Sequence, residues 1–537
     1  MDSQSVYIFD TTLRDGSQLE GISLTVEDKF RIAEQLDLLG VHFIEAGWPG
    51  ANPKDSEFFE RAKTELYLMN SKLVAFGATR KANVEVQEDA VMKELVNSGV
   101  QDLCLFGKTW DYHVEQALRT SLDEGLAMIS DSVEYLVGLG RRVHFDAEHF
   151  FDGFKNNKDF ALRCLDVAAN SGADFLVLCD TNGGTLPDEI YQIVQEVVAR
   201  FSNASNAPII SIHAHDDGAC AVANALAAVN AGAREVQGTI NGYGERTGNC
   251  NLVPVIANLS LKKGIKTIES ENIALLAPIS LSVAELVNMP LNPQAAYVGS
   301  KAFAHKAGVH TSAISRRSDA YEHIEPERVG NKTRFAVSEM AGRTAIDIKA
   351  HELGLQLDDI EISEIVDSLK KLEYDGYHFE VADASLELLM RQAAGWKQNF
   401  FKVINYEIVV DESEAKVGAF KSSETLTTKA KIEIEINGTQ YCEFSFGNGP
   451  VNALDNALRQ AVESQYPGLR DVHLLDYKVR ILDSDRATGA ITRVLIDSSN
   501  GHESWTTIGV SENIIEASWQ ALCDSLVIGL LRLGSGH

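Results

Sequence analysis

Two histidines separated by a single residue, His213 and His215 in the segment SIHAHDD, are the first chemical signal in the sequence. In a β-strand both side chains leave the same face, because side chains alternate along a strand. Asp15, in the N-terminal segment FDTTLRDGSQ, would add a carboxylate if the two segments met. Two imidazoles and one carboxylate can hold a divalent cation and leave positions open for substrate and water. A structural pair of histidines is the alternative interpretation of this motif taken alone.

Two further residues, Asn249 and Arg14, extend this candidate metal site. Asn249, in the glycine-rich segment NGYGERTGN, is a possible fourth, oxygen ligand, and the glycines there permit tight turns close to a ligand. Arg14 precedes Asp15 and could stabilise an oxyanion beside the cation. Alternatively, Arg14 only pairs with a neighbouring carboxylate. A 2-keto acid that chelated the cation would have its carbonyl group polarised, so these residue types indicate carbonyl chemistry on an anionic substrate.

Acid–base and substrate-binding candidates occur in two further segments. Glu148, in VHFDAEHFFDG, is flanked by aromatic residues that could desolvate it and raise its pKa towards a proton-transfer role. Thr181, in LCDTNGG, could hold a substrate carboxylate through its hydroxyl group. The DTNGG run is equally a good turn and helix-cap sequence, so both interpretations stay open.

The elements that must position these residues are eight short apolar runs that alternate with longer amphipathic stretches. The runs are 6–10, 42–46, 73–77, 102–106, 142–146, 175–180, 209–215 and 235–240. Eight alternations predict an α/β fold, a (β/α)₈ TIM barrel, better than a doubly wound sheet. The candidate residues follow the C-terminal ends of these runs, where barrel enzymes keep their active sites.

The rest of the chain changes character twice. Residues 1–275 are the predicted TIM-barrel catalytic domain, and a mostly helical pattern over 276–398 predicts a helical extension that links two domains. Over 399–537, alternating strands with fewer helices predict a C-terminal α+β domain suited to regulation or dimerisation.

Composition excludes two classes of partner. A formal net charge of -29 repels nucleic acid and anionic membranes at long range, so neither is a predicted partner. The N-terminus has no basic region followed by a long apolar run, and no run of about 18 apolar residues occurs, which predicts a cytoplasmic protein. Seven cysteines lie scattered without a CxxC pair, which predicts reduced thiols.

The motifs FDTTLRDGSQ, SIHAHDD and NGYGERTGN resemble those of the acetyl-CoA-dependent acyltransferases that include the 2-isopropylmalate, homocitrate and citramalate synthases. Hydroxymethylglutaryl-CoA lyase is a more distant relative of that family. The resemblance covers essentially the full length. Segments such as GISLTVEDKFRIAEQLDLLGVHFIEAGWPGANPKD, DAEHFFDGFK, AFAHKAGVH and FGNGPVNAL are similar to the long bacterial citramalate synthases. Leu19 and the EAGWP segment depart from the family pattern near the rim, where they bear on the shape of the keto-acid pocket.

The resemblance implies a role for each candidate residue. The implied metal ligands for Mg²⁺ or Mn²⁺, with Co²⁺ or Zn²⁺ compatible, are Asp15, His213, His215 and Asn249. The implied catalytic residues are Arg14, Glu148, His310 and Tyr321, and the substrate is held by Arg14, Asp15 and Thr181. His310 and Tyr321 come from the helical extension and are expected to reach the barrel of a partner subunit, which implies a homodimer. The C-terminal domain is expected to bind an end-product amino acid, isoleucine.

The expected activity is a metal-dependent Claisen condensation of acetyl-CoA with pyruvate that gives (R)-citramalate and free CoA, on the pyruvate route to isoleucine. The first alternative is the same reaction on a larger 2-keto acid, as in 2-isopropylmalate or homocitrate synthases. A second is a lyase that cleaves a hydroxyacyl-CoA. A third is a non-catalytic protein that uses the barrel to sense a metabolite.

Overall fold

The computed structural model of the chain describes residues 5–202, 206–305, 317, 321–335, 343–411, 427–482, 490–501 and 503–534. It divides into two compact units. The first comprises residues 1–303 and 322–333, and the second comprises 304–321 and 334–537.

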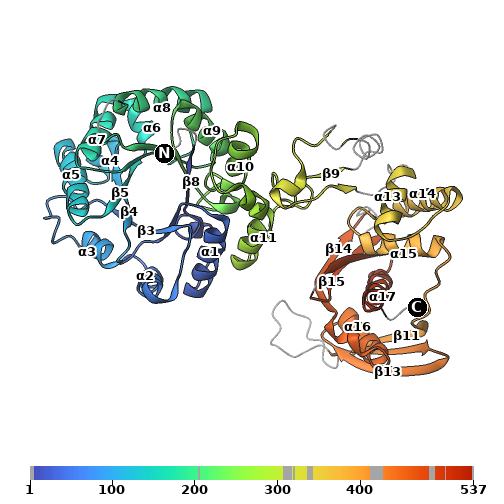
Figure 1. Ribbon diagram of the computed structural model, residues 1–537. Coiled ribbons are helices and arrows are strands. Elements are labelled where there is room, and N and C mark those ends of the chain that lie inside the picture. The colour runs from blue at the N-terminus through green and yellow to red at the C-terminus, as the bar shows by residue number, and fades with distance from the viewer. Residues whose placement is uncertain are drawn as a thin grey trace. The chain divides into compact units, whose positions relative to one another are not determined.

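Eight parallel strands close into a barrel in the first unit, ringed by helices (Figure 1). The barrel closes where β1 pairs with β8, with Ile8 opposite Val236. The strands are β1 (Tyr7–Asp10), β2 (Phe43–Gly47), β3 (Lys72–Ala78), β4 (Asp102–Lys108), β5 (Arg142–Glu148), β6 (Phe175–Asp180), β7 (Ile209–Ala214) and β8 (Glu235–Gly238). The predicted (β/α)₈ barrel is confirmed, because each apolar run forms one strand at nearly its predicted position.

The helices of this unit follow the strands in regular alternation. They are α1 (Val26–Leu39), α2 (Pro53–Glu65), α3 (Ala90–Asn97), α4 (Asp111–Gln116), α5 (Leu122–Gly138), α6 (Phe150–Asn156), α7 (Lys158–Asn170), α8 (Pro187–Phe201), α9 (Ala221–Ala231), α10 (Leu252–Ala257) and α11 (Leu276–Leu286). In α1, Thr25 and Asp28 form a capping box that satisfies the first amides. Gly40 ends α1 with a φ of 87°, a conformation that favours glycine.

An aromatic layer fills the N-terminal half of the barrel. The rings of Phe9, Phe43 and Phe175 pack around His144, which stacks on Phe175 at 4.0 Å. His144 is fully buried and lies 3.6 Å from carboxylate oxygens of both Asp102 and Glu235. This packed layer forms the floor of the barrel, and a cavity lined by polar and aromatic side chains lies nearer the C-terminal ends of the strands.

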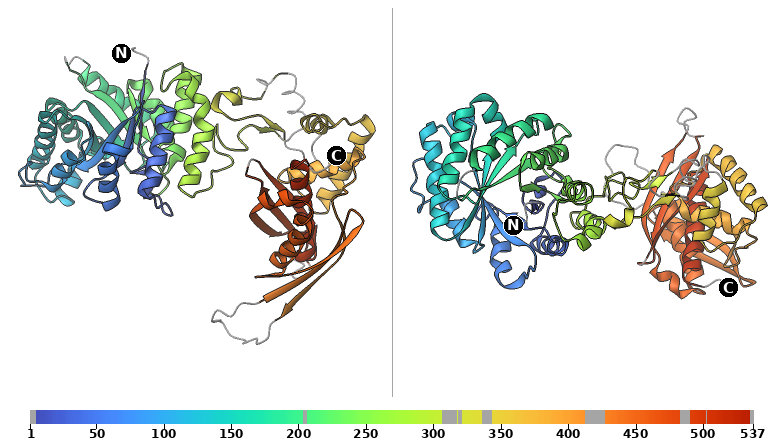
Figure 2. Two further views of the ribbon diagram at one scale, coloured as in Figure 1. Left: turned by 60° about the horizontal axis from the view of Figure 1, so that its bottom comes forward. Right: turned by 45° about the horizontal axis from the view of Figure 1, so that its top comes forward.

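The second unit opens with short elements and helices: β9 (Ala304–His305), β10 (Arg334–Phe335), α13 (Arg343–Glu352), α14 (Asp359–Tyr374) and α15 (Asp383–Ala393). Two three-stranded antiparallel sheets follow, each succeeded by a helix (Figure 2). The first group is β11 (Lys402–Asp411), β12 (Thr427–Ile436), β13 (Thr439–Gly447) and α16 (Pro450–Glu463). The second is β14 (His473–Ile481), β15 (Thr492–Ser499), β16 (Ser504–Ser511) and α17 (Ile514–Arg532). The predicted C-terminal α+β fold is thereby confirmed.

Helix α17 is the one helix, within the described part of the chain, whose length and composition would allow it to cross a membrane. Most of its apolar window is buried inside the protein, and it packs against β15 and β16. Trp519, Leu526 and Leu530 are buried members of the core of this unit. The apolar character of α17 is therefore explained by its place in a protein core.

Candidate active site

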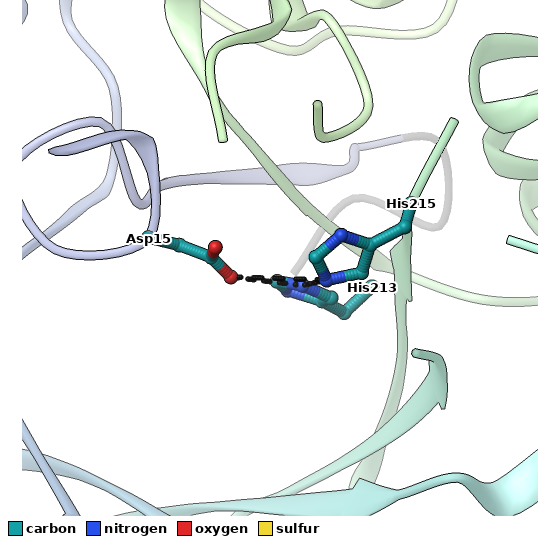
Figure 3. A group of neighbouring side chains, drawn as sticks. All are labelled: Asp15, His213 and His215. Atoms are coloured by element: carbon teal, nitrogen blue, oxygen red, sulfur yellow. Dashed lines mark hydrogen bonds and ion pairs between the residues drawn. The ribbon is translucent and has the colours of Figure 1, made fainter. Parts of the chain in front are cut away.

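Asp15, His213 and His215 meet at the C-terminal end of the barrel, and their ligand atoms all lie within 4.8 Å of one another (Figure 3). His213 Nε2 lies 3.4 Å from Asp15 Oδ2, and His215 Nε2 lies 3.9 Å from the same oxygen. The two Nε2 atoms are 3.3 Å apart, because His215 directly follows β7 and keeps its alternation, so that both side chains leave the same face. All three residues are buried. The structure therefore brings the predicted triad together.

Several buried atoms at this cluster have no hydrogen-bond partner among the described residues: Asp15 Oδ1, His215 Nδ1 and Asn249 Oδ1. Asn249 is held beside His215 by a backbone bridge, and its Nδ2 group donates to the Tyr243 carbonyl at 3.1 Å. Its side-chain oxygen is thus the free end. His213 Nδ1 pairs with Gln237 Oε1 at 3.0 Å, which leaves Nε2 to face Asp15. Buried carboxylate and amide oxygens without partners, beside the two imidazole Nε2 atoms, fit a divalent cation.

The electrostatics of Asp15 and His215 favour the forms that bind metals, and His213 is coupled to Asp15. Burial alone raises the pKa of the Asp15 carboxyl, but Arg14 and His213 outweigh burial and hold that pKa well below its usual range. Burial and the nearby His213 lower the pKa of His215 to about 4. Burial lowers the pKa of His213, but its hydrogen bond to Asp15 and the charge of that carboxylate raise it overall. A charged carboxylate and a neutral imidazole are ligand forms for a cation.

Arg14 is fixed from three sides. Its Nε group donates to Glu45 Oε2 at 2.6 Å, one Nη lies 3.1 Å from Asp15, and its guanidinium covers the Phe76 ring at 3.8 Å. The carboxylates keep the arginine charged, because burial lowers its pKa and the two acidic partners more than reverse that effect. Arg14 is thus paired, as the alternative interpretation expected, but it also lines the cavity.

The cavity has a volume of about 200 Å³. Its lining consists of Arg14, Asp15, Trp48, Phe76, Phe106, Asp146, Glu148, Cys179, Thr181, His213 and His215. Glu148 is the last residue of β5 and forms an ion pair with Lys108. The His149 amide donates to Thr181 Oγ1 at 2.8 Å. The Thr181 hydroxyl therefore keeps its own proton for an acceptor such as a substrate carboxylate.

Sequence reasoning missed several groups at this site. Glu45 and Asp146 face the barrel interior from β2 and β5, and burial together with the Glu45 charge raises the pKa of Asp146 to about 6. The two-residue alternation of side chains could have predicted them, because both acids lie within apolar runs that form buried strands. Lys108, at the end of β4, is the register partner of Glu148 across the sheet. That pairing needs the strand register, which the sequence does not show.

Two predicted residues come from outside the barrel. His310 lies outside the described residues. Tyr321 is exposed, belongs to the second unit, and is not among the described residues that line the cavity. Their predicted place in the barrel of a partner subunit stays a prediction.

Three family models match consecutive parts of the chain. The model described as HMGL-like matches residues 5–278, and one described as homocitrate synthase post-HMGL domain-like matches 297–376. The third, described as LeuA allosteric (dimerisation) domain, matches 380–528.

Curated relatives match the chain from end to end. An (R)-citramalate synthase from Aquifex aeolicus is 49% identical over 99% of this chain and 98% of its own length. One from Geobacter sulfurreducens is also 49% identical, over 97% of each chain. A 2-isopropylmalate synthase from Shewanella frigidimarina is 31% identical over 97% of this chain and 94% of its own.

Proposed function

The chain belongs to the HMGL-like family and shares its full length with (R)-citramalate synthases, and on this premise we propose that it joins acetyl-CoA to pyruvate, giving (R)-citramalate and free CoA. It is an acyltransferase of this family. The observation that carries the proposal is the buried triad of Asp15, His213 and His215 at the wall of a small cavity that Arg14 and Glu148 also line.

Asp15, His213 and His215, with Asn249 as a fourth ligand, would hold a divalent cation, for which we propose Mg²⁺ or Mn²⁺. When bound, such an ion acts as a Lewis acid that polarises the keto carbonyl group. Co²⁺ and Zn²⁺ are also compatible with mixed nitrogen and oxygen ligands.

The residues around the cavity bind the keto acid, stabilise the developing charge and transfer the proton. Thr181 donates its hydroxyl proton to the keto acid's carboxylate, and Arg14 stabilises the negative charge that develops on the keto oxygen. Glu148, assisted by His310 and Tyr321, accepts a proton from the acetyl methyl group. The methyl carbon then bonds to the keto carbon, and the keto oxygen becomes a hydroxyl group by taking up one proton, which balances the proton that the methyl group lost. Water hydrolyses the thioester, which releases citramalate and the CoA thiol.

Pyruvate is the proposed keto acid because the cavity is narrow and partly aromatic. The indole of Trp48 meets Phe76 and Phe106 edge-on at 5.5 and 5.7 Å, and these two rings stack on each other at 5.3 Å. A keto acid with a branched side chain would bring more apolar surface against this wall than pyruvate does. Sequence identity also favours pyruvate over larger keto acids. The chain is up to 49% identical to the citramalate synthases and 31% identical to the 2-isopropylmalate synthase from Shewanella frigidimarina.

A thiol-release assay with a panel of 2-keto acids tests the proposal. We expect kcat/KM to be highest for pyruvate, with release of one CoA per citramalate and dependence on added Mg²⁺ or Mn²⁺. A higher kcat/KM for 2-ketoisovalerate or 2-ketoglutarate would contradict the assignment. Cleavage of a hydroxyacyl-CoA without net condensation would instead identify a lyase.

Each part of the chain has a proposed role. We propose that residues 1–275 form the catalytic domain and that residues 276–398 form a linking region. Residues 399–537 form a domain that dimerises and binds isoleucine as an inhibitor. The match of the LeuA allosteric (dimerisation) domain to 380–528 supports this assignment. We also propose a cytoplasmic location, without nucleic-acid or membrane partners.

A further inference from the structure

Arg246 joins three loops at the rim of the barrel. It lies in the loop after β8 with a φ of 59°, in the left-handed region that non-glycine residues seldom adopt. Its guanidinium forms a two-pronged pair with Asp217, at 2.8 and 2.9 Å. One Nη also donates to the Thr181 carbonyl oxygen at 2.9 Å. One side chain therefore connects the loops that follow β6, β7 and β8.

Each of these loops carries a residue of the proposed site. Thr181 is itself the acceptor after β6, His215 lies two residues before Asp217, and Asn249 lies three residues after Arg246. The backbone continues the link, because the Asp216 amide donates to the Gly248 carbonyl at 3.0 Å. The three loops that Arg246 joins thus carry both substrate-binding and metal-binding groups.

The loops after β6 and β7 cross at close range, and Arg246 binds both of them. At Gly183, after β6, an added Cβ would lie 2.6 Å from the Asp217 backbone nitrogen. Such a packed crossing tolerates little displacement. A planar guanidinium can bind a carboxylate with two parallel bonds and still reach a carbonyl, whereas a lysine ammonium offers a single point charge.

We propose that Arg246 is a positioning residue that sets the spacing of Thr181, His215 and Asn249, and thereby the affinity for both the cation and the keto acid. This inference rests on the proposed function. Arg246 does not line the cavity, so it acts through the groups it holds. Glu148, the group proposed to act on acetyl-CoA, ends β5, and the described hydrogen bonds of Arg246 go to Asp217 and Thr181 instead.

The test compares Arg246→Met and Arg246→Lys with a matched surface pair. Arg200 forms a similar two-pronged pair with Asp166, at 2.7 and 2.6 Å, and its side chain is 43% exposed where that of Arg246 is 42% exposed. Mn²⁺ binding is measured by electron paramagnetic resonance without substrate, and KM is measured for pyruvate and for acetyl-CoA.

We expect Arg246→Met to raise the Kd for Mn²⁺ and the KM for pyruvate by about tenfold or more, the scale of lost support to a metal ligand. The KM for acetyl-CoA should stay within about twofold, Arg246→Lys should fall between, and Arg200→Met should change none of them. If Arg246→Met does not fold, Arg246→Lys decides by the same readouts.

An unchanged Kd for Mn²⁺ with an unchanged KM for pyruvate would overturn the inference and leave Arg246 as a surface ion pair. Absence of Mn²⁺ binding by the wild type would overturn it together with the metal site. If the wild type binds Mn²⁺ but turns over no keto acid, only the proposed function fails. The Kd values for Mn²⁺ of the wild type and the Arg246 variants then still test the role of Arg246.

Discussion

At the scale of single residues, the triad depends on complementary charges. Arg14 keeps Asp15 charged, and burial keeps His215 neutral, so a cation would meet a ready carboxylate and a free imidazole lone pair. Glu45 in turn holds Arg14 through a 2.6 Å hydrogen bond. The charge of each group is therefore set by its burial and by the charged groups around it.

Replacing His213 by alanine should abolish Mn²⁺ binding and lower kcat by about three orders of magnitude or more, because Lewis-acid stabilisation is worth several kcal/mol. Circular dichroism should show that the barrel remains folded. The control is His351→Ala, since that histidine is exposed and lies in the second unit. Wild-type turnover in His213→Ala would refute the metal site.

Lys108→Met should lower kcat by about 100-fold, the lower end of the usual scale of general acid–base catalysis. The physical reason is that Lys108 pairs with Glu148 and holds its carboxylate at the cavity. Glu148→Gln and the double variant are measured beside it. If Lys108 acts through Glu148, the double variant will be no slower than Glu148→Gln, whereas additive losses would mean independent roles.

At the scale of elements, neighbouring strands build the aromatic wall of the cavity. Phe106→Val should raise the ratio of kcat/KM for 2-ketoisovalerate over pyruvate by about tenfold or more, since one or two carbons in a pocket are worth about 1 to 3 kcal/mol. The control is Leu103→Ala on the same strand, a buried residue packed in the outer core. That variant should lose stability without changing the ratio, and an unchanged ratio in Phe106→Val would exclude the wall as a specificity element.

The barrel floor should make stability depend on pH. Burial lowers the pKa of His144, but Glu235 and Asp102 raise it to about 9. Because the pKa of His144 is higher in the folded than in the unfolded protein, its charge stabilises the fold fully below about pH 6.5. This stabilisation is lost as the pH rises through about 9. The loss is on the order of 3 kcal/mol.

Thermal unfolding from pH 6 to 10 tests this expectation on the wild type and His144→Gln. The difference in Tm between the two proteins should shrink as pH passes through about 9, while His351→Gln should follow the wild type throughout. Parallel profiles for wild type and His144→Gln would show that His144 carries no charge in the folded barrel.

At the scale of the whole molecule, the second unit repeats one arrangement, in which three antiparallel strands precede a helix that packs on them. The outer strands β13 and β14 expose large apolar side chains, among them Phe444, Phe446 and Leu475. Exposed apolar side chains on sheets are typical of surfaces that associate.

Light scattering of the full chain should give twice the mass of one chain, and isoleucine should lower citramalate formation in a saturable way. Valine and leucine serve as controls for the effector. A monomeric mass would contradict the proposed sharing of His310 and Tyr321 between subunits, and activity indifferent to isoleucine would contradict the proposed effector.

The sequence by itself determined the barrel, the C-terminal α+β fold and the gathering of the triad. These follow from local patterns: apolar runs of strand length, the two-residue period that places His213 and His215 on one face, and the position of Asp15 after the first strand. Contacts across strands and loops were decided by the tertiary structure alone. Lys108 meets Glu148 because of the register of β4 and β5, and Arg246 reaches Thr181 because barrel closure brings two distant loops together. Register and closure arise from packing of the whole barrel, so no local pattern in the sequence encodes these partners.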